Sequence, residues 1–269
     1  MLFSEIVYGP IHSRRLGTSL GVNLMPTNGK LCSFDCIYCE CGFNHPFPHP
    51  VLPTRTEVHE ALEAKLRSLS GEAGLSAERS LLFEHSGLID VITFSGNGEP
   101  TLHPEFEGII RDTCALRDRY YPNAKVSVLS NSTQLGREDV VRALRMCDNR
   151  ILKLDSGLTE SMRRIDAPVK RSLTVDDIIG KLQLFHGDFT LQTCFLRGTL
   201  PDGSRVDNTT PWELDAWYTA VQLLKPKQIM IYVIDRATPV QTLQKISREQ
   251  MEAIAAPLRA EGFDIIISA

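Results

Sequence analysis

Three cysteines on one short segment, Cys32, Cys36 and Cys39, are the residues of this chain best suited to chemistry. Cysteine thiolates are the protein ligands of iron–sulphur clusters and of many structural zinc ions. Structural zinc sites and electron-transfer clusters use four protein ligands, and no obvious fourth partner accompanies these three. The spacing therefore predicts a four-iron cluster held at three corners, with its last iron left open to bind a substrate or cofactor directly.

Other uses of these cysteines stay open from their spacing alone. A zinc site would need a distant fourth ligand, and His45, His49 and Cys41 lie close enough downstream, although zinc ligands usually come in matched pairs and no second pair is present. A disulfide framework is disfavoured, because 7 cysteines among 269 residues, several in apolar stretches, are typical of a reducing compartment. Cys41 is either a cluster ligand in a variant site or a free thiol on the same loop, and we interpret it as the free thiol.

Length and composition fit one enzyme-sized domain. The 269 residues, 42% of them hydrophobic, can bury the core of a single α/β barrel. A net charge of -4 argues against a general nucleic-acid coat or an anionic-membrane binder. Residues 1–6 lack the start of a secretory signal, and no stretch approaches the ~20 apolar residues that span a bilayer. We therefore expect a soluble, cytoplasmic protein without membrane contact.

Short apolar runs alternate with amphipathic stretches along the chain. The runs predict strands near 19–24, 91–95, 125–130, 150–155, 189–196, 228–234 and 263–268. Helices are expected near 57–68, 104–116, 137–146, 175–185, 211–224 and 247–261. Residues 43–55 and 199–211 are expected to be loops. Alternating strands and helices predict parallel pairing with right-handed crossovers, in an open sheet or a barrel.

Two polar groups follow the second and third predicted strands, at the strand ends where the chemistry of a barrel gathers. The first group is Ser95, Gly96, Asn97, Gly98 and Glu99. Its glycines let the backbone approach a ligand, and its carboxylate suits a positively charged group. The second group is Ser130, Asn131, Ser132 and Thr133. These side chains suit hydrogen bonds to ribose hydroxyls, while capping of the next helix is the alternative for the last two.

Lys153 and Asp155 share one face of the fourth predicted strand. A charged pair on an apolar strand needs partners, either in the barrel mouth or in a structural ion pair between neighbouring strands. On the fifth strand Gln192 and Cys194 face one way, which brings Gln192 toward a cofactor if that face is the lumen. We interpret Cys194 as a small buried residue rather than a hydrogen-atom donor.

Four arginines are candidate contacts for an anionic group of the substrate. Arg197 and Arg236 stand where the fifth and sixth predicted strands end. Arg14 and Arg15 lie in the N-terminal segment. An equal alternative is that these two tie that segment onto the barrel.

The cysteine segment resembles the signature of the radical S-adenosylmethionine (SAM) enzymes, which has the same spacing and an aromatic residue, here Tyr38, before the last cysteine. Residues 96–100 resemble their Gly-Gly-Glu-Pro element, with Asn97 in place of the second glycine. Residues 13–17 and 19–23 resemble a poorly characterised group of radical SAM iron–sulphur oxidoreductases, distantly similar to the wyosine-forming tRNA enzymes.

This resemblance implies the α/β class and a partial (β/α)6 TIM-like barrel of the radical SAM type, as a single domain over 1–269. Its expected parts are an N-terminal segment (1–18), the first strand (19–24), the cluster loop (30–42), a proline-rich loop (43–55) and the remaining strand–helix units (56–269).

The resemblance also implies an enzyme with a [4Fe-4S] cluster on the three cysteines and SAM as cofactor. The reduced cluster would cleave SAM to a 5'-deoxyadenosyl radical, which abstracts hydrogen from a small molecule, nucleoside or RNA base. An external electron donor of flavodoxin or ferredoxin type is expected. The alternatives are an activating enzyme for a glycyl-radical protein and a non-catalytic iron–sulphur or zinc protein. Residues expected to bind SAM are Tyr38, Ser95, Gly96, Asn97, Gly98, Glu99, Ser130, Asn131, Lys153, Asp155 and Gln192.

Overall fold

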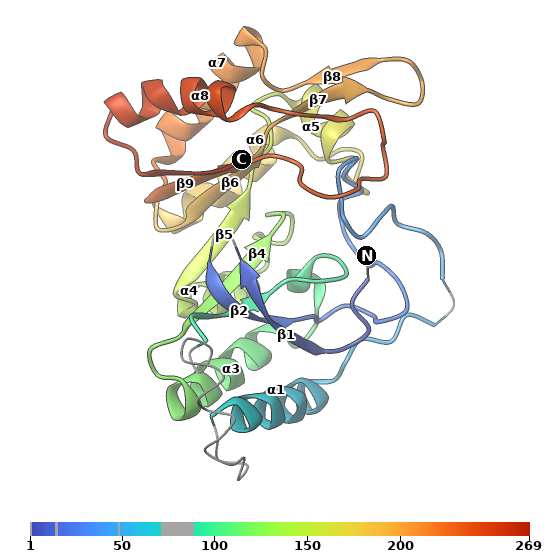
Figure 1. Ribbon diagram of the computed structural model, residues 1–269, viewed down its shortest axis with the longest axis vertical. Coiled ribbons are helices and arrows are strands. Elements are labelled where there is room, and N and C mark those ends of the chain that lie inside the picture. The colour runs from blue at the N-terminus through green and yellow to red at the C-terminus, as the bar shows by residue number, and fades with distance from the viewer. Residues whose placement is uncertain (1, 14–15, 48, 71–88) are drawn as a thin grey trace.

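The computed structural model describes residues 2–13, 16–47, 49–70 and 89–269. Its main element is an eight-stranded sheet that curves into a partial barrel, in the order β1-β2-β3-β4-β5-β6-β9-β11 (Figure 1). All strands from β2 onward pair in parallel, whereas β1 pairs antiparallel with β2. The strands are β1 (Val7–Ser13), β2 (Gly17–Val22), β3 (Val91–Phe94), β4 (Lys125–Ser130), β5 (Asn149–Lys153), β6 (Thr190–Cys194), β9 (Gln228–Tyr232) and β11 (Ile265–Ser268).

Helices connect these strands and pack against the outside of the sheet (Figure 1). The helices are α1 (Arg55–Leu69), α3 (Phe106–Tyr120), α4 (Glu138–Met146), α5 (Thr159–Ile165), α6 (Val175–Leu182), α7 (Pro211–Leu224) and α8 (Arg248–Ala260), with 3-10 turns η2 (Pro100–Leu102) and η3 (Gln183–Phe185). Capping boxes at Thr54, Thr174 and Ser247 start α1, α6 and α8. Among the described residues no helix is both long and apolar enough to cross a membrane.

The structure differs from the predicted elements in four places, one of which is helix α5, outside every predicted helix. The N-terminal segment contains β1, which forms a hairpin with β2. The predicted strand at 189–196 is two strands, β6 and then β7 (Leu196–Thr199). Strand β7 leaves the barrel to form a small sheet with β8 (Arg205–Asp207), in the predicted loop 199–211, and with β10 (Gln244–Lys245). These strands are held by pairing between distant segments, which apolar periodicity does not reveal.

Hydroxyl side chains lie on the inner faces of β2, β3 and β4. Phe94 of β3 packs edge-on against Phe106 of α3, on the outside of the sheet. Because successive side chains of a strand point to opposite faces, the preceding residue Thr93 faces inward. The Thr93 hydroxyl lies 2.8 Å from that of Ser19 on β2. Thr93 is also in register with Ser127 of β4. The barrel interior can therefore receive a polar ligand.

Candidate active site

The cysteine segment begins beyond the end of β2 and is attached to the turn that follows β3. Leu31 forms a parallel bridge with Gly98. The Leu31 N–H donates to the Asn97 carbonyl at 2.9 Å, and its carbonyl accepts from the Glu99 N–H at 3.1 Å. The two sequence groups predicted to share one cofactor, the three cysteines and residues 95–99, therefore start side by side at the carboxyl ends of β2 and β3.

Gly98 permits this close approach. Its φ is +149°, and a Cβ at this position would lie 1.8 Å from the Leu31 carbonyl oxygen. Because a backbone oxygen cannot rotate away, we expect Gly98→Ala to break the bridge and lower the free energy of unfolding by about 2 to 3 kcal/mol. Denaturant unfolding measures the loss.

Gly180→Ala is the matched control for this measurement. Gly180 lies within α6, where a Cβ would meet no atom within 4 Å. The added methyl should stabilise the protein by about 0.5 to 1 kcal/mol, because alanine loses less backbone entropy in a helix. A Gly98→Ala protein as stable as the wild type would show that the bridge does not need glycine.

The three predicted ligand cysteines are free thiols with different polar neighbours. The side-chain amide of Asn131 donates to Cys32 Sγ at 3.5 Å, and Lys153 Nζ donates to Cys36 Sγ at 3.2 Å. A hydrogen bond with Cys41 lowers the pKa of Cys39 to about 5, although burial opposes this shift. Burial raises the pKa of Cys32 to about 12. Iron binding at Cys32 would therefore release a proton.

Lys153 and Asp155 form a buried ion pair with each other. Lys153 Nζ lies 3.1 Å from Asp155 Oδ2 and 3.0 Å from Asp166 Oδ1. The Tyr38 hydroxyl donates to Asp155, and Lys153 Nζ lies 4.6 Å from the centroid of the Tyr38 ring. The aromatic residue of the cysteine segment and the charged residues at the end of β5 therefore belong to one network.

Asp166 is a member of this network that sequence reasoning missed. It is the C-cap of α5, and its carbonyl accepts from the Asp35 N–H at 2.8 Å. Its carboxylate accepts from Cys36 Sγ at 3.4 Å. Burial raises the pKa of Asp166 to about 7, against the opposing charge of Lys153. Asp166 belongs to no recognisable motif, and the helix that positions it, α5, lies outside the predicted helices.

Glu99 joins the polar groups that follow β3 and β4. One carboxylate oxygen accepts from the Asn131 N–H at 2.6 Å and the other from the Thr101 N–H at 3.1 Å. Burial raises the pKa of Glu99, whereas these hydrogen bonds lower it. A cation beside Glu99 would offset the cost of burying its charge.

The remaining residues predicted to bind SAM lie around the same strand ends. The Asn97 side chain donates to the Phe3 carbonyl at 2.8 Å and is fully buried, so it ties the N-terminal segment to the turn. Ser95 Oγ lies 2.8 Å from the Tyr8 hydroxyl of β1. Gln192 stands in register with Lys153 on the neighbouring strand. Gly96 follows Ser95 in the same turn, and Ser130 ends β4.

Ser132 and Thr133 do not cap the next helix, which corrects that alternative. Helix α4 begins at Glu138, and its N-cap is Arg137. The Ser132 hydroxyl instead donates to the Lys153 carbonyl at 3.0 Å.

The candidate substrate arginines are spread over the rim. Arg197 on β7 donates to Thr209 Oγ1 at 3.2 Å. Arg236 lies beyond β9 and donates to Glu40 Oε2 at 2.7 Å, which joins that segment to the cysteine segment. Arg14 and Arg15 lie outside the described residues.

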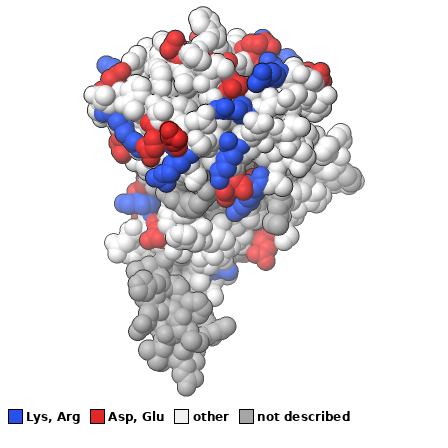
Figure 2. All heavy atoms as spheres, turned by 45° about the horizontal axis from the view of Figure 1, so that its top comes forward, with Lys and Arg blue, Asp and Glu red and all other residues white. Residues whose placement is uncertain are grey.

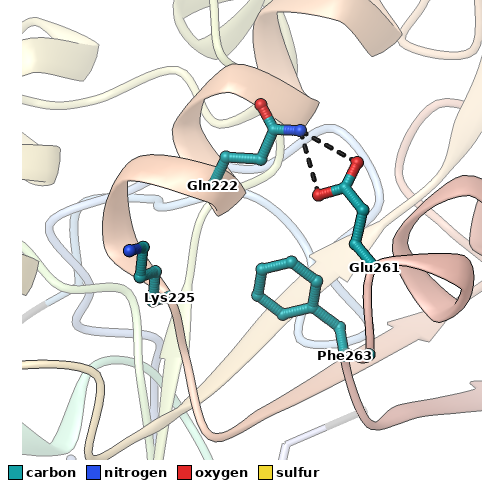
Figure 3. A pocket seen from close by; sticks show the side chains of 5 residues that line it. Gln222, Lys225, Glu261 and Phe263 are labelled. Atoms are coloured by element: carbon teal, nitrogen blue, oxygen red, sulfur yellow. Dashed lines mark hydrogen bonds between the residues drawn. The ribbon is translucent and has the colours of Figure 1, made fainter.

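A cavity of about 360 Å³ lies away from these groups, between the ends of α7 and α8. Gln222, Lys225, Glu261, Gly262 and Phe263 line it. Figure 3 shows the Gln222 amide bonded to the Glu261 carboxylate there. These residues precede β9 and β11, so the cavity lies at the amino ends of the strands and outside the candidate site.

Basic and acidic side chains are interspersed on the face shown in Figure 2. Exposed ion pairs occur among the described residues, for example Lys245 with Asp235 at 3.5 Å. The face in this view carries no continuous field of one sign of the kind that attracts a long polyanion.

Curated relatives share modest identity with the chain. It is 28% identical over 254 residues to GTPase Obg of Brachyspira hyodysenteriae, and 29% identical over 195 residues to a UPF0026 protein of Helicobacter pylori. These matches cover 93% and 72% of the chain. The chain spans only 33% and 57% of those two proteins. A UPF0026 protein of Synechocystis sp. is 26% identical over 247 residues, which are 87% of the chain and 77% of that protein. No family model matches.

Solved structures decide the fold. A radical SAM methyltransferase from Sphaerobacter thermophilus superposes with a TM-score of 0.62 at 16% identity, covering 93% of this chain and 65% of that one. The chain has the radical SAM fold. TYW1 with a lysine–pyruvate adduct gives a TM-score of 0.63 at 16% identity over 91% of this chain and 74% of that one. Streptococcus suis SuiB bound to SAM gives a TM-score of 0.61 at 12% identity, over 90% of this chain and 49% of that one.

The cysteine thiols at the end of the barrel form a set of ligands that suits an iron–sulphur cluster. Within the described ranges no three histidine, cysteine or acidic side chains are placed to hold one metal ion. A four-iron cluster makes a different demand, because each cysteine binds a separate iron. The chain supplies three free thiols on one segment, and hydrogen-bond donors at the sulphur atoms of Cys32 and Cys36. This set fits a [4Fe-4S] cluster with three protein ligands.

Proposed function

We propose that this protein is a radical SAM enzyme, which cleaves SAM reductively and removes hydrogen from a small molecule, a nucleoside or an RNA base. The observation that carries the proposal is the bridge between Leu31 and Gly98, which joins the cysteine segment to residues 95–99. The radical SAM fold supports the same reading.

The cysteine segment would bind the cluster, and residues of that segment and of the strand ends would bind SAM. Cys32, Cys36 and Cys39 would hold the [4Fe-4S] cluster. When bound, the reduced cluster supplies the electron that cleaves SAM to methionine and a hydrogen-abstracting 5'-deoxyadenosyl radical. An electron donor of flavodoxin or ferredoxin type would act from outside. Residues that would hold SAM are Tyr38, Ser95, Gly96, Asn97, Gly98, Glu99, Ser130, Asn131, Lys153, Asp155 and Gln192.

The charges of the site suit the two ends of an amino acid. Glu99 is a buried carboxylate with no cation among its described hydrogen-bond partners, so it suits an ammonium group. The buried ammonium of Lys153 forms ion pairs with Asp155 and Asp166. A ligand carboxylate could also accept a hydrogen bond from this ammonium. The methionine moiety of SAM carries both groups. Arg197 and Arg236 stand at the rim, where an anionic part of the substrate would approach.

Internal partners also hold the polar side chains of the site in place. Tyr38, Asp155 and Cys194 are buried, with Asp155 bonded to the Tyr38 hydroxyl and to the Cys194 N–H. A site that excludes water would keep a reactive species from side reactions.

SAM cleavage is the measurement that tests the proposal. The protein is loaded anaerobically with iron and sulphide, reduced with dithionite and given SAM, and 5'-deoxyadenosine is quantified by mass spectrometry. We expect product only when both SAM and reductant are present. A protein that gives no product and instead retains zinc on the three cysteines would point to the metal-binding alternative.

A further inference from the structure

Lys30 is buried between the two ends of the cysteine segment. Its side chain is 3% exposed, and its Nζ lies 3.2 Å from Asp35 Oδ1 and 2.8 Å from the Gly42 carbonyl oxygen. The same Asp35 oxygen accepts from the Asn44 N–H at 2.7 Å. These four residues therefore close a ring of contacts around the part of the chain that carries the three cysteines.

The charge of Lys30 is poorly balanced by its partner. The Asp35 side chain is 28% exposed, so solvent screens its negative charge far more than the positive charge of the buried lysine. Lys30 precedes Cys32 by two residues, and its contacts at Asp35 and Gly42 stand on either side of Cys36 and Cys39 in the chain. The buried ammonium is therefore held against the loop that carries all three thiols.

An iron–sulphur centre on three thiolates is negatively charged and gains another negative charge on reduction. Its reduction potential depends on the charges and hydrogen bonds around it. A fixed positive charge in a poorly solvated place stabilises the more negative, reduced form more than the oxidised form. No other lysine of the described ranges contacts both ends of the cysteine segment in this way.

We propose that Lys30 is a positioning residue of this site, which closes the cysteine segment and raises the reduction potential of the centre that the segment holds. This inference rests on the proposed function, because it assumes that the centre is the [4Fe-4S] cluster. The residues that carry the inference, Lys30, Asp35 and Gly42, all belong to the loop that holds the cysteines.

The test compares reduction potentials in three loaded variants, by redox titration monitored with electron paramagnetic resonance. Lys30→Met keeps the length of the side chain and removes its charge. We expect its reduction equilibrium to shift at least tenfold toward the oxidised form, which is 59 mV for a one-electron couple. Asp35→Asn keeps an oxygen for Lys30 and Asn44 and removes the opposing charge, so its potential should rise. Lys227→Met alters an exposed lysine paired with Asp188 and should leave the potential unchanged.

The two loop variants are expected to shift the reduction potential in opposite directions if charge is the cause. A loosened loop would instead shift the potential of both variants in the same direction. A Lys30→Met potential equal to or above the wild-type value would overturn the inference. If Lys30→Met holds no iron, Asp35→Asn decides: a raised potential supports the inference, and an unchanged or lowered one overturns it. A wild-type protein that binds no cluster refutes the proposed function, whereas a loaded wild type with an unshifted Lys30→Met refutes this inference alone.

Discussion

A Cys36→Ala protein should bind less iron and form no 5'-deoxyadenosine above background. Cys36 is the central cysteine of the segment, 8% exposed, with its sulphur between Lys153 and Asp166. Loss of an outer hydrogen-bonding partner of a metal ligand costs roughly 10- to 100-fold in affinity or activity, and loss of the ligand itself should exceed that. Iron content and the yield of 5'-deoxyadenosine, after identical anaerobic loading, measure the effect.

Cys114→Ala is the matched control. This cysteine lies on α3, half-buried, with its sulphur 3.9 Å from the Met146 carbonyl oxygen and far along the chain from the segment. Its loss should leave iron content and SAM cleavage unchanged. Product formed by Cys36→Ala at the wild-type rate would show that the three cysteines do not hold the reactive centre.

The barrel strands could be predicted because each is an apolar run between helices with clear start signals. Strand β4 occupies the predicted range 125–130, and the capping residues Thr174 and Ser247 start helices at the beginning of the predicted ranges 175–185 and 247–261. The outer face of each strand packs against helices and must be apolar, whichever strands lie beside it. Local composition is therefore enough to predict such a strand. The cysteine spacing and the turn at 95–99 were equally visible, because each is a local sequence pattern.

What could not be predicted depends on contacts between distant parts of the chain. Cys36 and Asp166 lie 130 residues apart, and no periodicity links them. Lys30 reads as an ordinary loop lysine until folding buries it against Asp35. Strand β8 has three residues and exists because it pairs with β7. Short strands and isolated charged residues take their roles from tertiary packing, which a single sequence does not encode locally.

Lys153→Met should be the most destabilising single change at the site. Lys153 is the cation for two buried acids, Asp155 and Asp166, whose side chains are 0% and 2% exposed. Removing one partner of a buried ion pair leaves an uncompensated charge and typically costs about 3 to 5 kcal/mol. We expect a loss of that size in the free energy of unfolding of the metal-free, reduced protein, measured by denaturant unfolding at about pH 8.5, because Asp166, with a pKa of about 7, is charged there.

Two further variants identify the cause of that loss. In a Lys153→Met/Asp166→Asn protein one unpaired carboxylate is gone, so part of the lost stability should return. Lys245→Met removes a 49% exposed lysine, paired with Asp235 at 3.5 Å, and should cost less than about 1 kcal/mol. If Lys153→Met costs no more than Lys245→Met, the ammonium of Lys153 does not stabilise the buried carboxylates of Asp155 and Asp166 more than an exposed lysine stabilises its partner, and this prediction is wrong.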